Sequence, residues 1–180
     1  MVEKARNRMM KNGFEDQAKE FKPEIQFFSE EVKTSKHNED IKFTNFLNRA
    51  TPEITKQLVR SVMQNPYIVA GRPDNVRITD KVKNCISLYA TDIDDDPLVW
   101  KSDIRDASDQ QKAVRVYTMF YLPDNDPNAK PLFNIVIIDP FHLVIPSEYK
   151  GMTKVEMEHQ VYNENRSNSI CISTLNSLFD

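Results

Sequence analysis

The sequence predicts an α+β fold in which helices pack against a small antiparallel β-sheet. Three patterns predict this class: apolar residues at helical spacing over 51–64, strand-like alternation over 113–122, and a nearly continuous apolar run over 132–139. The 180 residues suit one domain with a terminal extension. We therefore predict a helical N-terminal extension at 1–40 and a single α+β domain at 41–180 that ends in a C-terminal helix.

The N-terminal segment 14–32 spaces its apolar residues by three and four, as an amphipathic helix does. Pro23 interrupts the pattern, so we expect two short helices or one kinked helix, followed by a polar linker at 33–40. The segment either packs on its own domain or binds in a groove of a partner protein. The apolar positions are Phe14, Ala18, Phe21, Ile25, Phe28 and Val32.

The first half of the domain contains one clear helix. Residues 41–47 fit either a strand or a helical turn. Thr51 is a candidate N-cap and Pro52 fits the first helical position. Residues 66–84 are interpreted as a basic, loop-rich stretch, and CISLYA at 85–90 as a strand.

The second half is expected to form the sheet. Residues 98–106 are predicted to be a strand that carries Trp100, and the strands 113–122 and 132–139 to form an antiparallel hairpin. The turn between these two is rich in Pro, Asp and Asn. Alternation places one set of side chains on the same face of 113–122, namely Arg115, Tyr117, Met119 and Tyr121.

The C-terminal part begins with a helix-start signal. Thr153 and Glu156 have the spacing of a capping box, which predicts a helix from about 153 to 163. The tail at 170–179 is apolar enough to dock on a surface of this chain or of a partner.

Composition and motifs exclude several common classes of protein. With 3 glycines, the chain has no glycine-rich phosphate loop. Cys85 and Cys171 lie far apart without metal-ligand spacing and are interpreted as buried, reduced thiols. The acidic run at 92–96 does not fit a calcium loop, and no segment fits a signal peptide or a membrane span. We expect no cofactor, no metal, no membrane contact and a cytoplasmic location.

The net charge of −3 is unevenly distributed. Residues 41–90 carry eight Lys and Arg against three acidic residues, whereas 91–180 carry eight against fifteen. The basic half either provides a surface for an anionic partner or complements the acidic half within the fold.

Candidate functional residues cluster around the predicted hairpin. Arg115 with tyrosines on one sheet face suits phosphate contact and base stacking, or else packing beneath a helix. His142 closely follows Asp139, and a carboxylate near an imidazole suits general acid–base chemistry, while the alternative is a histidine at the strand end that is hydrogen-bonded to backbone. The candidate catalytic residues are Arg115, His142 and Tyr117, and the candidate binding residues are Arg105, Tyr121, Arg72, Arg77, Lys81 and Lys83.

The order of elements resembles that of the RelE/ParE toxin superfamily over about residues 41–145. VRVYTMFY at 114–121 is similar to the arginine-bearing strand of that family, and IVIIDPFHLV at 135–144 to its last strand. The resemblance implies that Arg115 stabilises a phosphate, that His142 transfers protons, and that Arg105 is a second phosphate contact. It further implies cleavage of RNA without a metal.

Two functional hypotheses follow. The first is a toxin-like domain that acts on RNA or the ribosome, in the form of a metal-independent endoribonuclease. The second is a non-enzymatic interaction or regulatory protein, encoded by a phage or mobile element, that binds a host protein through 14–32 or 170–179. A related alternative is an assembly protein that dimerises through the edge of its sheet.

Overall fold

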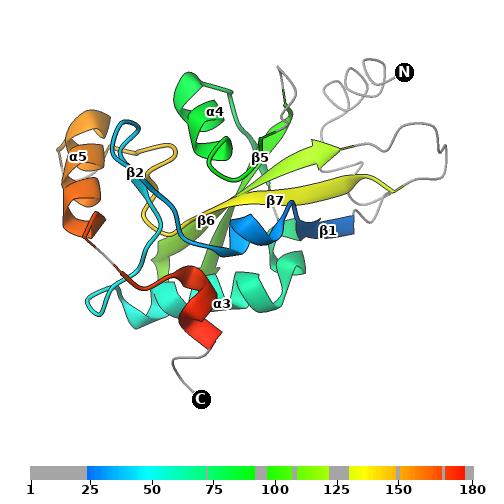
Figure 1. Cartoon of the computed structure of the whole chain (residues 1–180), viewed down its shortest axis with the longest axis horizontal. Helices are drawn as coiled ribbons and strands as arrows, with labels where there is room; N and C mark the ends of the chain where they lie inside the picture. Colours follow the sequence, from blue (N-terminus) through cyan, green and yellow to red (C-terminus); the bar gives the residue numbers. More distant parts are fainter. Residues whose placement is uncertain are drawn as a thin grey trace.

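The computed structural model describes residues 24–71, 73–91, 97–106, 109–121, 130–148, 151–167 and 169–176. It has the predicted α+β class (Figure 1). The main sheet has the strand order β1-β7-β6-β5-β4. Its strands are β1 (Glu24–Phe27), β4 (Asp74–Asn75), β5 (Val99–Asp106), β6 (Asp109–Tyr121) and β7 (Leu132–Asp139).

The sheet is mixed rather than wholly antiparallel. The hairpin of β6 and β7 and the pairing of β5 with β6 are antiparallel, as predicted. β1 pairs with β7 in parallel, with Ile25 opposite Phe133. The prediction of a helix is therefore wrong over residues 24–32, which form β1 and the short helix η1 (Glu30–Lys33), while residues 14–23 lie outside the described part. Spacings of three and four did not reveal this strand, because its pairing partner lies about a hundred residues away in the sequence.

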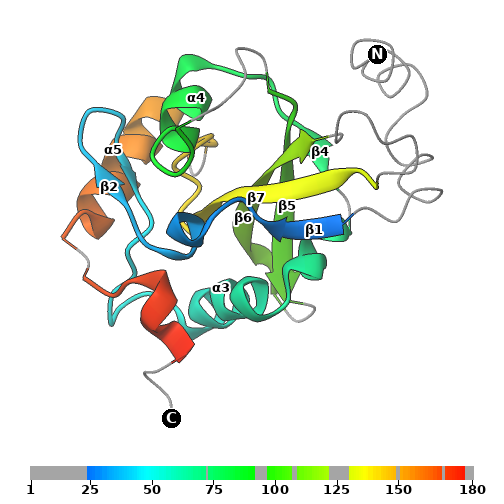
Figure 2. The same cartoon turned by 45° about the vertical axis from the view of Figure 1, so that its right-hand side comes forward.

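Helices cover both faces of the sheet. The amphipathic helix α3 (Glu53–Gln64) packs against β5 and β6, and α4 (Asp80–Ile86) contacts β7. Figures 1 and 2 show α3 and α4 on opposite sides of the strands. Helix α3 begins one residue after the predicted position, since the Thr51 hydroxyl bonds to Asn48 instead of capping the helix.

The basic stretch 66–84 is more ordered than predicted. It forms the short helix η2 (Pro66–Ala70), β4 and most of α4, which is capped by the Thr79 side chain. The strand predicted at 85–90 is wrong, because Cys85 and Ile86 belong to α4 and a turn follows. A short apolar run does not distinguish a buried strand from a buried helical turn.

The C-terminal helix α5 (Lys154–Asn165) has the predicted capping box between Thr153 and Glu156. It lies beside the small hairpin of β2 (His37–Asn38) and β3 (Phe43–Thr44), where Tyr162 stacks on His37. The tail forms the short helix η3 (Ile172–Asn176), which packs on α3. Segment 24–40 and the tail thus both contribute residues to the core, with Val32, Ile172 and Leu175 buried.

Candidate functional site

A row of charged residues crosses three strands of the sheet. In the register, Arg115 of β6 lies opposite both Asp103 of β5 and Asp139 of β7. Directly opposed residues project from the same face of a sheet. The cation therefore stands between two carboxylates on the face that α4 covers.

Arg115 is held by three partners. Its Nη1 donates to the carbonyl oxygen of Ile145 at 2.5 Å, and its Nη2 donates to Ser147 Oγ at 3.1 Å. Its Nε lies 3.4 Å from Asp103 Oδ1, which is an ion pair rather than a close hydrogen bond. The side chain is 12% exposed. Arg115 thus fastens the segment that follows β7 onto β5 and β6.

Asp139 organises the turn after β7. Its carboxylate is fully buried and accepts hydrogen bonds from three backbone N–H groups, those of Phe141, Leu143 and Val144. The carboxylate therefore does not orient the His142 ring, and of the two alternatives that the sequence left open, the backbone-bonded histidine is the one observed. An Asp followed by Pro at the end of an apolar strand is a turn signal that could have revealed this.

His142 lies in the same turn with a left-handed backbone, at φ 60°. Its Nε2 is 2.9 Å from the carbonyl oxygen of Ala113. Because a carbonyl only accepts, Nε2 carries the proton in this contact and Nδ1 is the nitrogen that can accept one. Ala113 is paired with Arg105, whose side chain is 50% exposed. His142, Arg105 and Arg115 are consequently neighbours near the tip of the β5–β6 hairpin.

Tyr117 lies two residues after Arg115, on the same face of β6, and solvent does not reach it. The residue has no exposed surface, and its hydroxyl has no hydrogen-bond partner among the described residues. Burial raises the pKa of Tyr117 well above its ordinary value, and the nearby charge of Asp139 adds to the shift. A buried, protonated phenol of this kind cannot contact a substrate unless α4 moves.

The other candidate binding residues are dispersed. Lys81 forms an ion pair with Glu158 that joins α4 to α5. Lys83 and Arg77 are exposed, and Arg77 follows β4 near the start of β5, away from the hairpin tip. Tyr121 is 48% exposed and pairs with Leu132 at the far end of β6. Arg72 lies outside the described residues.

The described residues contain no group of His, Cys, Asp and Glu arranged to hold a metal ion. None of the helices in the described segments is long and apolar enough to cross a membrane.

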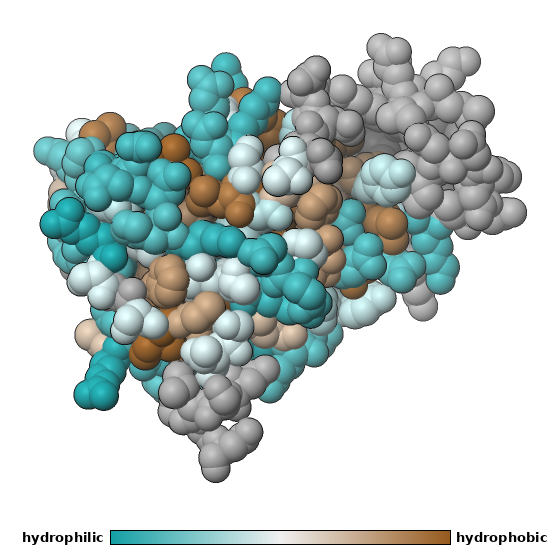
Figure 3. All heavy atoms as spheres, viewed as in Figure 1, coloured by the Kyte–Doolittle hydropathy of each residue, from teal (hydrophilic) through white to brown (hydrophobic). Residues whose placement is uncertain are grey.

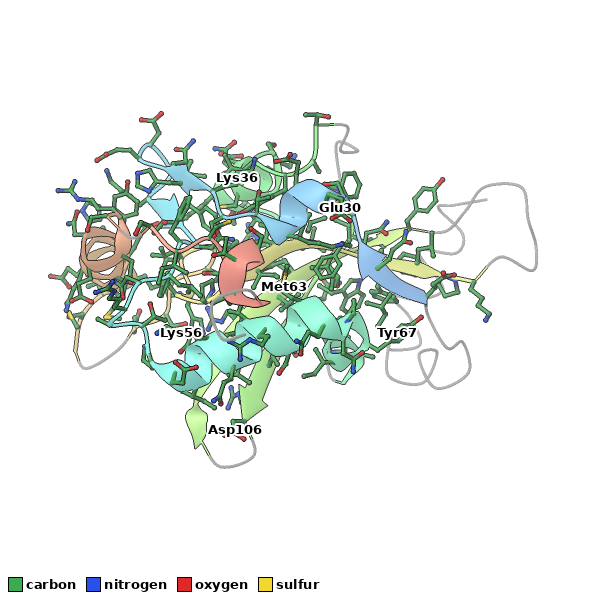
Figure 4. The ribbon with its side chains drawn as sticks, turned by 60° about the horizontal axis from the view of Figure 1, so that its bottom comes forward. Glu30, Lys36, Lys56, Met63, Tyr67 and Asp106 are labelled. Atoms are coloured by element: carbon green, nitrogen blue, oxygen red, sulfur yellow. The ribbon has the colours of Figure 1, made fainter. Side chains whose placement is uncertain are left out.

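Exposed apolar side chains gather near β1. Phe28, directly after the strand, is 36% exposed, while Tyr67 and Ile68 of η2, which contacts β1, are 55% and 38% exposed. Figure 4 shows Tyr67 at the end of α3 on the same side of the molecule as β1, with Asp106 at the distant tip of the hairpin. The sequence placed Phe28 in a candidate partner-binding segment but gave no indication that Tyr67 and Ile68 lie near β1, because these residues are far apart in the chain.

Comparison of the chain with models of protein families, with curated proteins and with solved structures finds no match.

Proposed function

We propose that this protein is a non-enzymatic interaction protein that binds another polypeptide at the surface around β1. The observation that supports this is the gathering of Phe28, Tyr67 and Ile68 beside an edge strand. Phe28 lies on one side of β1, and Tyr67 and Ile68 of η2 lie on the other, so the strand edge is flanked by exposed apolar side chains, which are typical of interaction sites. The cytoplasmic location expected from the sequence is part of the same proposal.

The state of the candidate catalytic residues also supports binding over catalysis. Arg115 donates to partners within the fold, and the Tyr117 hydroxyl is buried. A phosphate-binding arginine needs free N–H groups that face solvent. Here the guanidinium stabilises the turn that Asp139 organises, which is a structural role.

The described parts of the two segments first suggested for partner binding, 24–32 and 170–176, contribute buried residues to the core. Ile25 and Val32 are buried, as are Ile172 and Leu175. Deleting 14–32 or 170–179 would therefore damage folding and would not test binding. Point substitutions on the exposed surface are the better experiment.

The test compares affinity capture from cell lysate by the tagged wild type and by a Tyr67→Ser, Ile68→Ser double variant. Val155→Ser is the matched control, because Val155 is 63% exposed and lies on α5. We expect the wild type and the control to retain the same polypeptide, and the double variant to lose it while its circular dichroism is unchanged. Equal capture by all three proteins, or no capture, would refute the proposal.

The second candidate function is the RNA-acting, toxin-like activity that the RelE/ParE resemblance implies. The specific observation in its favour is that Arg105, Arg115 and His142 lie together, with Arg105 half exposed. Its test is RNA cleavage and growth arrest by an Arg105→Ala, His142→Gly variant, in which glycine suits the left-handed backbone. Loss of both activities with the fold intact would support this function, and wild-type protein without either activity would exclude it.

A further inference from the structure

The outer side of β1 offers unpaired backbone groups. Glu24 N donates to Pro131 O and Phe28 N donates to Ile135 O, so the even-numbered residues direct their N–H groups toward β7. In a strand, the N–H and C=O of neighbouring residues point in opposite directions. Ile25 and Phe27 therefore direct theirs away from the sheet, and within the described segments no strand pairs there.

The two edges of the sheet differ in how they are protected against strand addition. The β5 edge is partly covered by β4, carries Lys101, Asp103 and Arg105, and has a register irregularity at Arg105/Asp106. Charged side chains and bulges are features that block edge-to-edge pairing. β1 has the sequence EIQF, with one charged residue, Glu24, and without lysine, arginine or proline, and it is in regular register with β7. Apart from Glu24 and its short length, β1 has neither the bulge nor the paired cover that protects the β5 edge.

We propose that β1 pairs with β1 of a second copy of this chain, antiparallel and across a twofold axis at Gln26. This inference rests on the proposed function and names the partner. The arrangement places Ile25 opposite Phe27 of the second copy, so that the outward backbone groups of both strands bond to each other. The main sheets of the two copies thereby become one continuous sheet.

Side-chain chemistry favours this occupant. Ile25 and Phe27 form an aliphatic–aromatic cross-strand pair, a combination that stabilises antiparallel strands. Glu24 faces Phe28 of the second copy, and Gln26 faces its own equivalent, so no like charges are opposed. Self-complementary twofold interfaces are also the commonest kind in homo-oligomers.

Side chains around β1 add to the surface area that the proposed dimer would bury, because the short strand alone buries too little. A strand of 4 residues buries less surface than a stable dimer needs. Phe28 on one side of the edge, and Tyr67 and Ile68 of η2 on the other, extend the contact. In the view of Figure 3, a few hydrophobic residues are exposed among hydrophilic ones in the region where Figure 1 places β1.

Sedimentation velocity of the full chain over a range of concentrations tests the inference. Gln26→Lys places two ammonium groups opposite each other at the twofold axis, in a side chain that is exposed in the monomer. We expect a wild-type dimer whose dissociation constant rises at least about tenfold in Gln26→Lys, since opposed like charges disfavour pairing. Gln57→Lys, the same change at an exposed position of α3, should leave the dimer intact.

The outcomes separate this inference from the proposed function. A wild type that is monomeric at every concentration, or a dimer that Gln26→Lys does not weaken, would overturn the inference. If a monomeric wild type still captures a different polypeptide through Tyr67 and Ile68, the proposed function is supported and the partner is not a second copy. A dimer dispersed by Gln26→Lys, with a co-expressed untagged copy as the captured polypeptide, would support both.

Discussion

The two faces of the central sheet are built from alternate residues of the same strands but are held together in different ways. The face toward α3 is packed with apolar side chains such as Val114, Val116 and Ile138, all without exposed surface. The face toward α4 contains Asp103, Arg115, Asp139 and the buried phenol of Tyr117. The first face depends on packing, and the second on satisfying the hydrogen bonds of groups that are costly to bury.

This difference explains why a polar strand face need not be a functional surface. Alternation of apolar and polar residues normally indicates that the polar side faces water. Here α4 and the turn after β7 close over that side, so its charges neutralise one another within the fold. Polarity in the sequence predicted which side chains share a face, but not whether solvent reaches them.

The prediction with the largest expected effect tests whether α4 shields from solvent the sheet face that carries Asp103, Arg115 and Asp139. Burial raises the pKa of the Cys85 thiol, on α4, to about 12. At pH 8 a thiol with this pKa has on the order of 10⁻⁴ of its molecules as thiolate, the reactive form. We expect iodoacetamide to leave Cys85 unmodified in the native protein and to react with it after unfolding, as measured by mass spectrometry.

Cys171 is the internal control for that experiment. Burial alone would raise its pKa, but hydrogen bonds from Ser173 and Ser35 outweigh burial and lower the pKa below its ordinary value. The rate at which iodoacetamide modifies Cys171 should rise with pH and level off at a lower pH than it does for an ordinary thiol. Native Cys85 reacting as fast as Cys171 would show that the polar face is open.

The second prediction compares neighbouring residues that face opposite sides of β7. Asp139→Ala removes the acceptor of three backbone N–H groups and leaves Arg115 without one of its flanking carboxylates. We expect it to lower the free energy of unfolding by about 3–5 kcal/mol. Ile138→Val, equally buried, should cost about 0.5–1.5 kcal/mol. Urea denaturation measures both, and equal losses would contradict a structural role for the carboxylate.

Local sequence patterns predicted the elements that are stabilised by interactions between residues close together in the sequence. Helices α3 and α5 and strands β6 and β7 were recognisable from periodicity, alternation and a capping box, because these features act within a few residues. β1 was missed, since its conformation is imposed by pairing with β7 in the tertiary structure. α4 was missed although Thr79 and Asp80 form a helix-start signal, because the apolar run after them also fits a strand.

The candidate site was predictable to a similar degree. Strand register brings Arg105 and Arg115 onto one face, and the short distance in sequence from Asp139 to His142 brings the imidazole near them. The bonds from Asp139 to its following backbone, and from Arg115 to Ile145, depend on a turn whose shape local sequence does not specify. Those bonds are the basis on which we propose a structural role for the arginine.

The smallest expected effect concerns the hydroxyl of Tyr117. Because that oxygen is buried without a hydrogen-bond partner among the described residues, Tyr117→Phe removes a desolvation cost while keeping the ring in the core. We expect the free energy of unfolding to be unchanged or to increase by up to about 1 kcal/mol. A loss of more than about 1 kcal/mol in urea denaturation would mean that the hydroxyl has a partner. If Tyr117→Phe instead abolished a binding or catalytic activity without lowering stability, the hydroxyl would have a functional role. That result would favour the hypothesis that Arg115 and His142 are catalytic residues.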